Sequence, residues 1–433
     1  MNNFSLLLFE WKHFLQNKFK VIALLLFLIC CLFSMNNGYN LYLTQKKQID
    51  TLITEQTKNN QKILGYFDKN QKSPEDYPWI DYSTPFWAIY YAEKHEVKMP
   101  SPLMPFSVGQ TEQYGYYKKI TTWSTPYDAD LVEEIANPER LGIGSLDFSF
   151  TLLYLTPILL IILLFNIGGL ESDFQFTKLI KIQNGSYFQW LFNRYLFYFL
   201  SITIPLTLLM FVFGYLTNTL QNTIFYELIL FVLSYIFLWF AGFILIAKSV
   251  QSSQIMAIKM LACWLIICIL IPATVAQIAS YKYPINYMTS FIDANRDDAY
   301  KIYDLPKDTL KATLITKIPK LRNTKVGKQI AIDEDAINNS LVLLIADLNA
   351  AALTEVEEKN NLKNNFIKST YFFNPVTFFQ NKLNQKSNSD YYAFLKYRNQ
   401  IDVAIKNKQT KLLMDSWNKV VVDKNKYIEY LKN

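Results

Sequence analysis

Cysteine and histidine are scarce in this chain, whose 433 residues include four cysteines and two histidines. The cysteines all fall inside long apolar runs, at Cys30, Cys31, Cys263 and Cys268. The polar parts of the chain therefore contain no thiol for a disulfide framework, and no cysteine pair has the C-x-x-C spacing of a zinc site. The two histidines, His13 and His95, are far apart, and we expect no bound metal and no cofactor.

Catalytic signatures are missing as well. The one Gly-Lys pair, Gly327-Lys328, lacks the upstream glycine and the following hydroxyl of the phosphate loop G-x-x-x-x-G-K-[ST], so this route to ATP binding is closed. No G-x-S-x-G elbow and no H-E-x-x-H motif occurs. Met99 and Met104 near His95 would suit a soft metal such as copper, but their irregular spacing favours loop packing. We expect no enzyme activity from this chain itself.

Charged residues are absent from five long apolar runs. These runs are Val21–Leu43, Phe148–Leu170, Tyr195–Leu216, Leu228–Ala247 and Met260–Tyr281. Each has about the 20 residues that a helix needs to cross ~30 Å of hydrocarbon. Mean hydropathy is nevertheless only +0.07, because large polar blocks dilute the runs. The sequence predicts an all-α polytopic membrane protein with five transmembrane helices, the last four within residues 148–281.

Basic residues beside the runs predict the orientation of the chain. They precede the first run and occupy the links between runs two and three and between runs four and five, at Lys12, Lys18, Lys20, Lys178, Lys181, Arg194, Lys248 and Lys259. By the positive-inside rule we expect these segments to be cytoplasmic. Residues 44–147 and 282–433 are then two mainly helical extracytoplasmic domains. The net charge of +7 belongs to this pattern, and we expect no nucleic-acid partner.

Helical spacing also occurs outside the five runs. In residues 1–20 it predicts an amphipathic helix on the inner face of the membrane, the alternative being an extension of the first span. The apolar positions of this segment are Phe4, Leu7, Leu8, Trp11, Phe14 and Leu15. In the second domain, Ala331–Phe366 and Tyr391–Lys419 predict two long helices.

The cytoplasmic segment 171–189 has an amphipathic pattern of its own. It carries Phe174, Leu179, Ile180 and Ile182, interleaved with Lys178 and Lys181. A short helix of this kind docks in a groove of another protein, the alternative being a helix that contacts lipid only.

Short motifs around the second run and in the second domain carry a family signal. The first group is Asn137-Pro138, Gly144, Asp147-Phe148, Glu171, Asp173 and Thr177-Lys178-Leu179-Ile180. The second group is Phe373-Asn374-Pro375 with Gln380, Asn384, Ser389 and Asp390. Together they resemble the membrane subunits of type-2 ATP-binding-cassette transporters, in the branch with large extracytoplasmic insertions that includes the permeases for nitrous oxide reductase maturation. The order of elements is similar too, so the resemblance covers nearly the whole chain.

The resemblance implies a permease subunit that couples ATP hydrolysis by a separate subunit to export or extraction of a substrate that the sequence does not name. It also implies a second permease copy, identical or related, and contact with membrane lipid. Segment 171–189 would be the coupling helix that docks on the ATP-binding subunit. Within it, Glu171 and Asp173 would fix the link to the spans, and Thr177, Lys178, Leu179 and Ile180 would belong to the docking segment.

The chain departs from the family pattern in two places. Phe176 stands where the family has glycine, so the local turn should differ. Nothing after Lys419 is apolar enough for the sixth span that usually follows the second insertion. Either the protein has five spans and an outer C-terminus, or the sixth helix is missing from the sequence. With a single tether, the second domain should pack on the first through Tyr and Phe side chains, and its C-terminal residues should fray.

A second class of function fits the same spans. A membrane-anchored scaffold or mechanotransmitter would bind a partner through its extracytoplasmic domains, transport nothing and depend on no ATPase. An enzyme ranks third, because no polar cluster lies inside the runs where chemistry would be protected.

Overall fold

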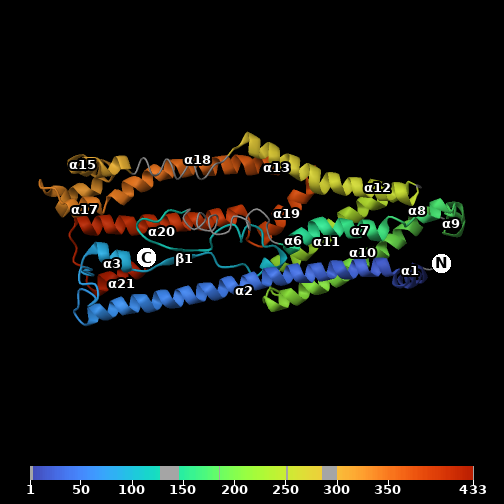
Figure 1. Cartoon of the computed structure of the whole chain (residues 1–433), viewed down its shortest axis with the longest axis horizontal. Helices are drawn as coiled ribbons and strands as arrows, with labels where there is room; N and C mark the ends of the chain where they lie inside the picture. Colours follow the sequence, from blue (N-terminus) through green and yellow to red (C-terminus); the bar gives the residue numbers. More distant parts are fainter. Residues whose placement is uncertain (1–2, 127–145, 185, 250–251, 285–299, 433) are drawn as a thin grey trace.

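The computed structural model describes residues 3–126, 146–184, 186–249, 252–284 and 300–432. Helices dominate, and most of them run along one long axis (Figure 1). At one end of that axis, here called the α9 end, lie α1 (Asn3–Gln16), α8 (Gly169–Asp173) and α9 (Thr177–Asn184). At the opposite end lie α3 (Pro85–Tyr91) and α21 (Lys424–Lys432).

Within the described residues, five helices are long and apolar enough to cross a membrane, as the sequence predicts. Three of them are unbroken, namely α2 (Lys18–Asp68), α10 (Tyr187–Leu216) and α11 (Thr223–Lys248). The second is assembled from α6 (Phe148–Phe150), the π-helical segment η2 (Thr151–Leu155), α7 (Thr156–Leu164) and α8. The fifth contains α12 (Ser253–Trp264), the π-helical segment η3 (Leu265–Leu270) and α13 (Ile271–Lys282).

The bundle is apolar on its outer surface as well as in its interior. Large aromatic residues fill the interior, including Tyr195, Tyr198, Tyr235 and Phe243. Outward-facing positions are also apolar and exposed, among them Leu25, Ile29, Leu208, Leu230, Leu245 and Ile258. A water-soluble protein rarely exposes so much contiguous apolar surface, so the bundle has the surface of a membrane protein.

Helix α2 extends far beyond the predicted span 21–43. Its 51 residues correspond to a rod of roughly 77 Å at 1.5 Å per residue, more than twice the thickness of a hydrocarbon layer. The sequence between Leu43 and Asp68 contains no proline, and its buried Ile49 and Ile63 keep the helix packed against other segments. The helical spacing of Ile49, Ile63 and Leu64 predicts this continuation beyond the span, and packing maintains the helix where hydropathy falls.

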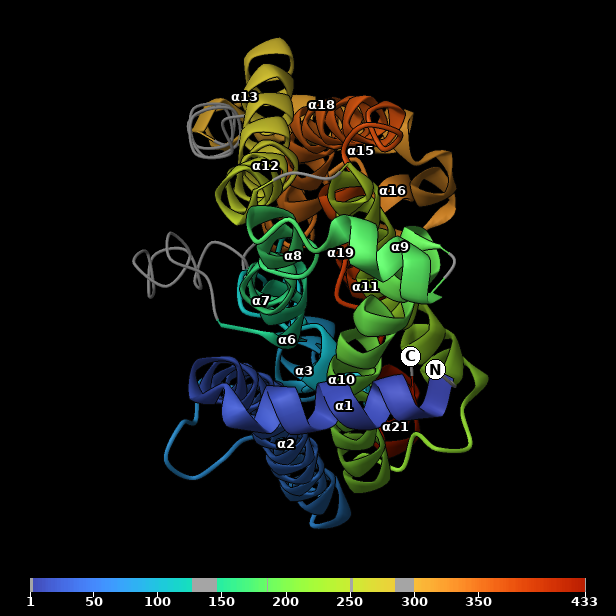
Figure 2. The ribbon, with the colours of Figure 1, turned by 90° about the vertical axis from the view of Figure 1, so that its right-hand side faces the viewer.

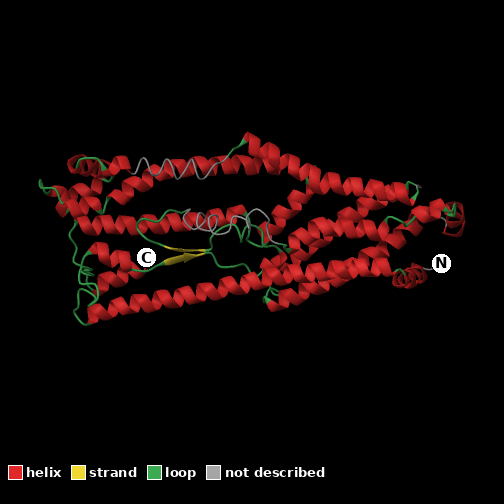
Figure 3. Ribbon diagram, viewed as in Figure 1, coloured by secondary structure: helices red, strands yellow, loops and turns green. Residues whose placement is uncertain are grey.

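The first polar block, residues 44–147, is less helical than predicted. After α2 and α3 its described part contains the strands β1 (His95–Val97) and β2 (Tyr117–Lys119), with η1 (Met104–Phe106) between them. The strands, yellow in Figure 3, pair antiparallel. His95 lies opposite Lys119. Prolines recur through this part of the chain and interrupt helices, at Pro74, Pro78, Pro85, Pro100, Pro102 and Pro105.

The second polar block, residues 282–433, is helical in its described part, as predicted. Its elements are α15 (Lys307–Lys317), η5 (Pro319–Asn323), α16 (Lys325–Lys328), α17 (Glu334–Asn338), α18 (Leu341–Ser369), α19 (Pro375–Lys386), α20 (Tyr391–Trp417) and α21. The predicted helix Ala331–Phe366 is divided at Asn339 and Ser340. Ser340 Oγ accepts a hydrogen bond from Trp417 Nε1 at 2.8 Å, which fixes the break against α20.

The two blocks pack on each other along α20. Lys408 Nζ donates to the carbonyl oxygens of Ala92 and Ile120 at 2.8 and 2.9 Å, and Gln409 Nε2 donates to the carbonyl of Thr122 at 2.8 Å. These carbonyl oxygens of the first block lie outside its helices and strands. Side chains of the second block thus donate the hydrogen bonds that these buried acceptors need.

The C-terminal helix is also part of this interface. Tyr427 is fully buried and its ring contacts Phe67 of α2, with centroids 5.3 Å apart. Tyr430 is buried beside it and donates to Asp415 Oδ2 at 2.7 Å. The expected packing through Tyr and Phe side chains is therefore present, and aromatic burial holds α21 against the first block.

Replacing Tyr427 by Ala should release α21 and loosen the two blocks. Loss of a buried aromatic side chain costs about 3–5 kcal/mol, and here it removes the anchor of a short helix. Limited proteolysis in detergent should then remove the last residues quickly. Val421→Ala is the matched control, because Val421 is exposed in the same segment. Equal protease resistance of both variants would contradict the anchoring role.

Lys408 should make the stability of the two blocks depend on pH. Burial lowers the pKa of Lys408 to about 8, and repulsion from Lys119 adds to this. Its pKa in the unfolded chain is higher, so the unfolded state holds the proton longer and the free energy of unfolding rises with pH above 8. The rise from Lys408 should reach roughly 2 kcal/mol by ~pH 10. Urea unfolding followed by tryptophan fluorescence should show it.

The variant Lys408→Met removes the titrating group, so its pH profile should be flatter than that of the wild type across the same interval. Lys406→Met, an exposed neighbour on α20, should keep the wild-type slope. Parallel profiles for wild type and Lys408→Met would contradict this assignment.

Candidate functional site

The predicted coupling helix 171–189 is a hairpin of two short helices rather than one. Residue Gln175, with φ +60°, turns the chain between α8 and α9, and α10 begins at Tyr187. Gly168 starts the hairpin with φ +86°, and a Cβ there would meet Tyr187 Oη at 2.6 Å. Only glycine combines this backbone conformation with such a close neighbour. The predicted coupling helix 171–189 is thus divided, because the chain turns at Gln175 and a separate helix, α10, begins at Tyr187.

Glu171 joins the hairpin to two other helices through Arg194. One carboxylate oxygen of Glu171 accepts from Arg194 Nη1, and the other accepts from Gly168 N at 2.8 Å. Arg194 Nε lies 2.5 Å from Glu10 Oε1 of α1. Glu10 is 1% exposed and Arg194 is buried, so the three groups form an ion network inside a largely apolar end of the bundle. It fastens α1, α8 and α10 to one another.

Asp173 fastens the other side of the hairpin. Its Oδ2 accepts from Ser253 Oγ at 2.7 Å and from Ser253 N at 3.2 Å. Ser253 is the first residue of α12, so a carboxylate stands at the N-terminal end of that helix, where a negative charge is favourable. The two predicted acids thus tie the hairpin to different spans.

Lys20 forms a second buried polar centre beside the ion network. Its Nζ donates to Leu163 O at 2.6 Å and to Asn166 Oδ1 at 2.8 Å, and it lies 4.8 Å from the centre of the Tyr198 ring. Leu163 O belongs to the last turn of α7, whose carbonyls lack helical partners. The ammonium therefore caps α7 and holds α2 and α10 against it.

The outer side of the hairpin exposes large apolar side chains. Those of Phe174, Phe176, Leu179 and Ile182 are exposed, and we call this set the exposed face of the hairpin. Ile182 reaches 81% exposure, whereas the neighbouring Ile180 is 9% exposed and packs into the core of the bundle. Lys178 and Lys181 are also exposed, and Thr177 is half-buried. Of the predicted docking residues, Leu179 and Lys178 therefore face outward, while Ile180 anchors the hairpin.

Helix α1 lies across the α9 end as a separate element. It ends at Gln16, and α2 starts at Lys18, so the chain turns at Asn17 (Figure 2). Phe14 is buried against Tyr198, whereas Trp11 and Leu15 are exposed; the side chains of Phe4, Leu7 and Leu8 are outside the described part. This favours an amphipathic surface helix over an extension of the first span.

The remaining family-motif residues lie where the spans meet the polar blocks. Asp147 caps the start of the second span by accepting from Phe150 N at 2.8 Å, and it also accepts from Val108 N at 3.2 Å. Asn374 is fully buried and caps α19 at Thr377 N, with Pro375 as the first residue of the helix. Asn137, Pro138 and Gly144 are outside the described residues.

One short loop brings several of these motif residues together. Ser107 Oγ donates to Asn384 Oδ1 at 2.5 Å, and Gln110 N donates to Ser389 O at 2.9 Å. Gly109 between them has φ +54°, and a Cβ there would lie 2.5 Å from Ser389 Oγ. Residues 107–110, the clamp loop, therefore join the second span to the second polar block.

Some site residues were not recognisable as such from the sequence. Glu10 is the only acidic residue among the first 49, and that isolation within an apolar helix is the signal that could have identified it. Arg194 and Lys20 were assigned to membrane orientation, because their buried partners lie far away in the sequence.

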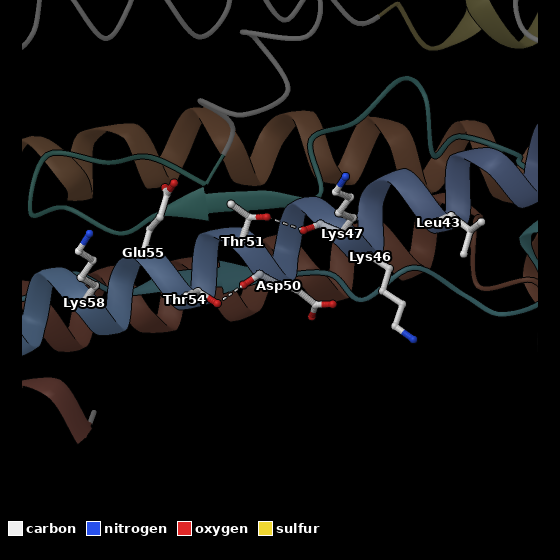
Figure 4. A pocket seen from close by; sticks show the side chains of 8 residues that line it. All are labelled: Leu43, Lys46, Lys47, Asp50, Thr51, Thr54, Glu55 and Lys58. Atoms are coloured by element: carbon white, nitrogen blue, oxygen red, sulfur yellow. Dashed lines mark hydrogen bonds between the residues drawn. The ribbon is translucent and has the colours of Figure 1, made fainter.

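A pocket of about 760 Å³ beside α2 is not a comparable site (Figure 4). All of its lining residues come from one helix and carry both charges: Leu43, Lys46, Lys47, Asp50, Thr51, Thr54, Glu55 and Lys58. The two threonine hydroxyls donate back to the carbonyls of Lys47 and Asp50. The lining is therefore a solvated helix face without converging groups from a second element.

Comparisons with known proteins add no relative to this picture. No protein-family model matches the chain, and no curated protein or solved structure matches it significantly.

Replacing Arg194 by Met should destabilise the α9 end strongly. The change leaves Glu10 buried without its cation, which costs about 3–5 kcal/mol. Adding Glu10→Gln should recover part of this loss, because the uncompensated charge is then removed. Thermal unfolding in detergent measures both effects, with the exposed Lys181→Met as control. A double variant no more stable than Arg194→Met alone would contradict the coupling between the two residues.

Proposed function

We propose that this chain is the membrane-spanning permease subunit of an ATP-binding-cassette transporter. It would couple ATP hydrolysis by a separate subunit to the export or extraction of a substrate. The observation that carries this proposal is the exposed face of the hairpin, four large apolar side chains presented on an element whose base is tied to the bundle by Glu171 and Asp173. The motif resemblance adds the identity of the partner.

The exposed face has the composition of a docking surface for protein. Aromatic and aliphatic anchors such as Phe174, Leu179 and Ile182 supply most of the binding energy when they enter pockets of a partner. Lys178 and Lys181 stand between them and favour a partner groove with an acidic rim. A helix that contacts lipid alone would not need acids that fix its base to two different spans.

The anchoring of the hairpin also supports a route for mechanical coupling. A partner that shifts α9 would pull on α10 and α1 through Glu171 and on α12 through Asp173. Packed helices move as rigid elements between alternative arrangements, so such a shift would reach the opposite end of the spans. ATP binding and hydrolysis would then act by changing the populations of these arrangements.

In the proposed orientation, the α9 end is cytoplasmic and both polar blocks are extracytoplasmic. The lysines and arginines beside the spans support this arrangement in a plasma (inner) membrane. By the same resemblance, a second permease copy, identical or related, completes the transporter.

A mechanotransmitter without transport is the second candidate. The unbroken helix α2 favours it, because one rod of 51 residues runs from the bundle into the first polar block (Figure 1). If this candidate is correct and no ATPase is involved, the exposed face of the hairpin has no nucleotide-binding partner.

Replacing Leu179 and Ile182 by Asp should abolish partner binding. Two charges would enter an apolar contact, at a cost on the order of several kcal/mol, while buried Ile180 stays in place to support the fold. After mild solubilisation of native membranes, the ATP-binding subunit should co-purify with the wild type and not with this variant. Ile330→Asp, at a fully exposed apolar residue of the second polar block, is the control. Undiminished co-purification with the hairpin variant would refute the docking assignment.

Cysteine labelling in intact cells tests the orientation. Cysteines introduced at the exposed positions Glu75 and Lys328, one in each polar block, should react with a membrane-impermeant thiol reagent. A cysteine at Lys181 on α9 should react only after lysis. Labelling of position 181 in intact cells, or protection of position 328, would invert or break the proposed topology.

A further inference from the structure

A pocket of about 500 Å³ lies where α18, α19 and the start of α20 meet. Phe378 lines it, and its ring contacts Phe231 of α11 with centroids 5.9 Å apart. Phe379 and Leu383 of α19 belong to the same apolar core as the spans, and Phe378 packs against that core. The pocket therefore lies at the boundary between the apolar bundle and the second polar block. Figure 1 shows α19 between the spans and the rest of that block. Its volume is in the range of small-molecule sites.

The lining of this pocket combines positive charge with hydrogen-bonding groups. Lys368 and Lys382 supply two ammonium groups, and Lys368 Nζ donates to Tyr392 Oη at 2.9 Å. The one carboxylate in the lining, Asp390, caps α20 by accepting from Ala393 N at 3.2 Å. Amide side chains complete the lining, so it favours an anionic group that carries further polar atoms.

A second polar feature points to a hydrogen-bond donor on the ligand. Gln110 lines the pocket from the clamp loop, and its Oε1 is buried. Among the residues that the structure describes, none donates to this oxygen. A buried acceptor without a donor is unfavourable, and a hydroxyl or ammonium group entering the pocket would satisfy it.

Exposed aromatic residues lie directly beside the pocket. Phe372 is 99% exposed and Phe373 is also exposed, in the turn that leads into α19. Their neighbour Tyr371 lines the pocket and contacts Phe378 with ring centroids 5.4 Å apart. Aromatic side chains at the apolar boundary of a membrane protein occupy the headgroup layer, where one side is apolar and the other wet.

We propose that this pocket binds the headgroup of a membrane phospholipid. The phosphate would lie between Lys368 and Lys382, and a hydroxyl or ammonium substituent would donate to Gln110 Oε1. The acyl chains would leave past Phe372 and Phe373 along the apolar surface of the bundle. A free phosphate offers the same anion, but it makes no use of the apolar boundary on which the pocket lies. The site is independent of the ATPase partner, which would bind at the other end of the spans.

Lipid titration of the delipidated full chain, followed by native mass spectrometry, tests the proposal. Dioleoyl phosphatidylglycerol should add one tightly held molecule, whereas dioleoylglycerol, which lacks the phosphate, should bind much more weakly. The double variant Lys368→Gln, Lys382→Gln should weaken phosphatidylglycerol binding by about tenfold or more, because two charge-assisted contacts are lost. The matched control Lys359→Gln, Lys406→Gln removes two lysines from exposed ion pairs on α18 and α20 and should bind as the wild type does.

Three results would overturn the proposal, and two of them need only the wild-type protein. Equal binding of dioleoylglycerol would show that the acyl chains alone decide affinity. Binding of inorganic phosphate without preference for phosphatidylglycerol would assign the pocket to a soluble anion. Unchanged lipid affinity in the Lys368, Lys382 variant, with a wild-type elution profile, would exclude this pocket as the site.

Discussion

The organisation of the α9 end depends on one buried cation. Arg194 lies in a largely apolar end of the bundle, between Glu171 and Glu10, and an uncompensated charge in that place would cost several kcal/mol. The helices that carry these three residues must therefore keep their relative positions. That requirement accounts for a short hairpin that presents Leu179 and Ile182 outward without collapsing onto the bundle. A docking surface needs such preorganisation, because ordering a mobile segment would reduce the affinity.

At the opposite end of the spans, hydrogen bonds between polar groups likewise hold separate segments together. The clamp loop joins Asp147, at the start of the second span, to Asn384 and Ser389 of the second polar block, and α20 donates to carbonyls of the first block. Helix α2 runs alongside both regions. Packed helices connect the α9 end to the polar blocks without a break. In the proposed coupling, a displacement of the α9 end would therefore be transmitted through these helices to the polar blocks.

The sequence predicted the five apolar helices well, because a run of about 20 uncharged, apolar residues is rare in water-soluble chains and suits a bilayer. It also predicted that the first helix continues past its apolar run to Leu64, and packing against η1 and α21 maintains that helix after hydropathy has fallen. Periodicity could not separate Leu179 from Ile180, which are adjacent although the first is exposed and the second is buried. The ion pair between Glu10 and Arg194 joins residues far apart in the chain, so the sequence could not predict it. No motif identified the clamp loop, although this loop contacts several of the motif residues.

We propose that the exposed face of the hairpin binds a separate ATP-binding subunit. The most direct test is a photo-crosslinking amino acid at Ile182, the most exposed residue of that face, introduced into the full chain in its native cells. After irradiation, mass spectrometry of the crosslinked product should identify a protein with a nucleotide-binding phosphate loop, and the same probe at Ile330 should not capture it. Crosslinks from position 182 to lipid alone, or to no nucleotide-binding protein, would contradict the account.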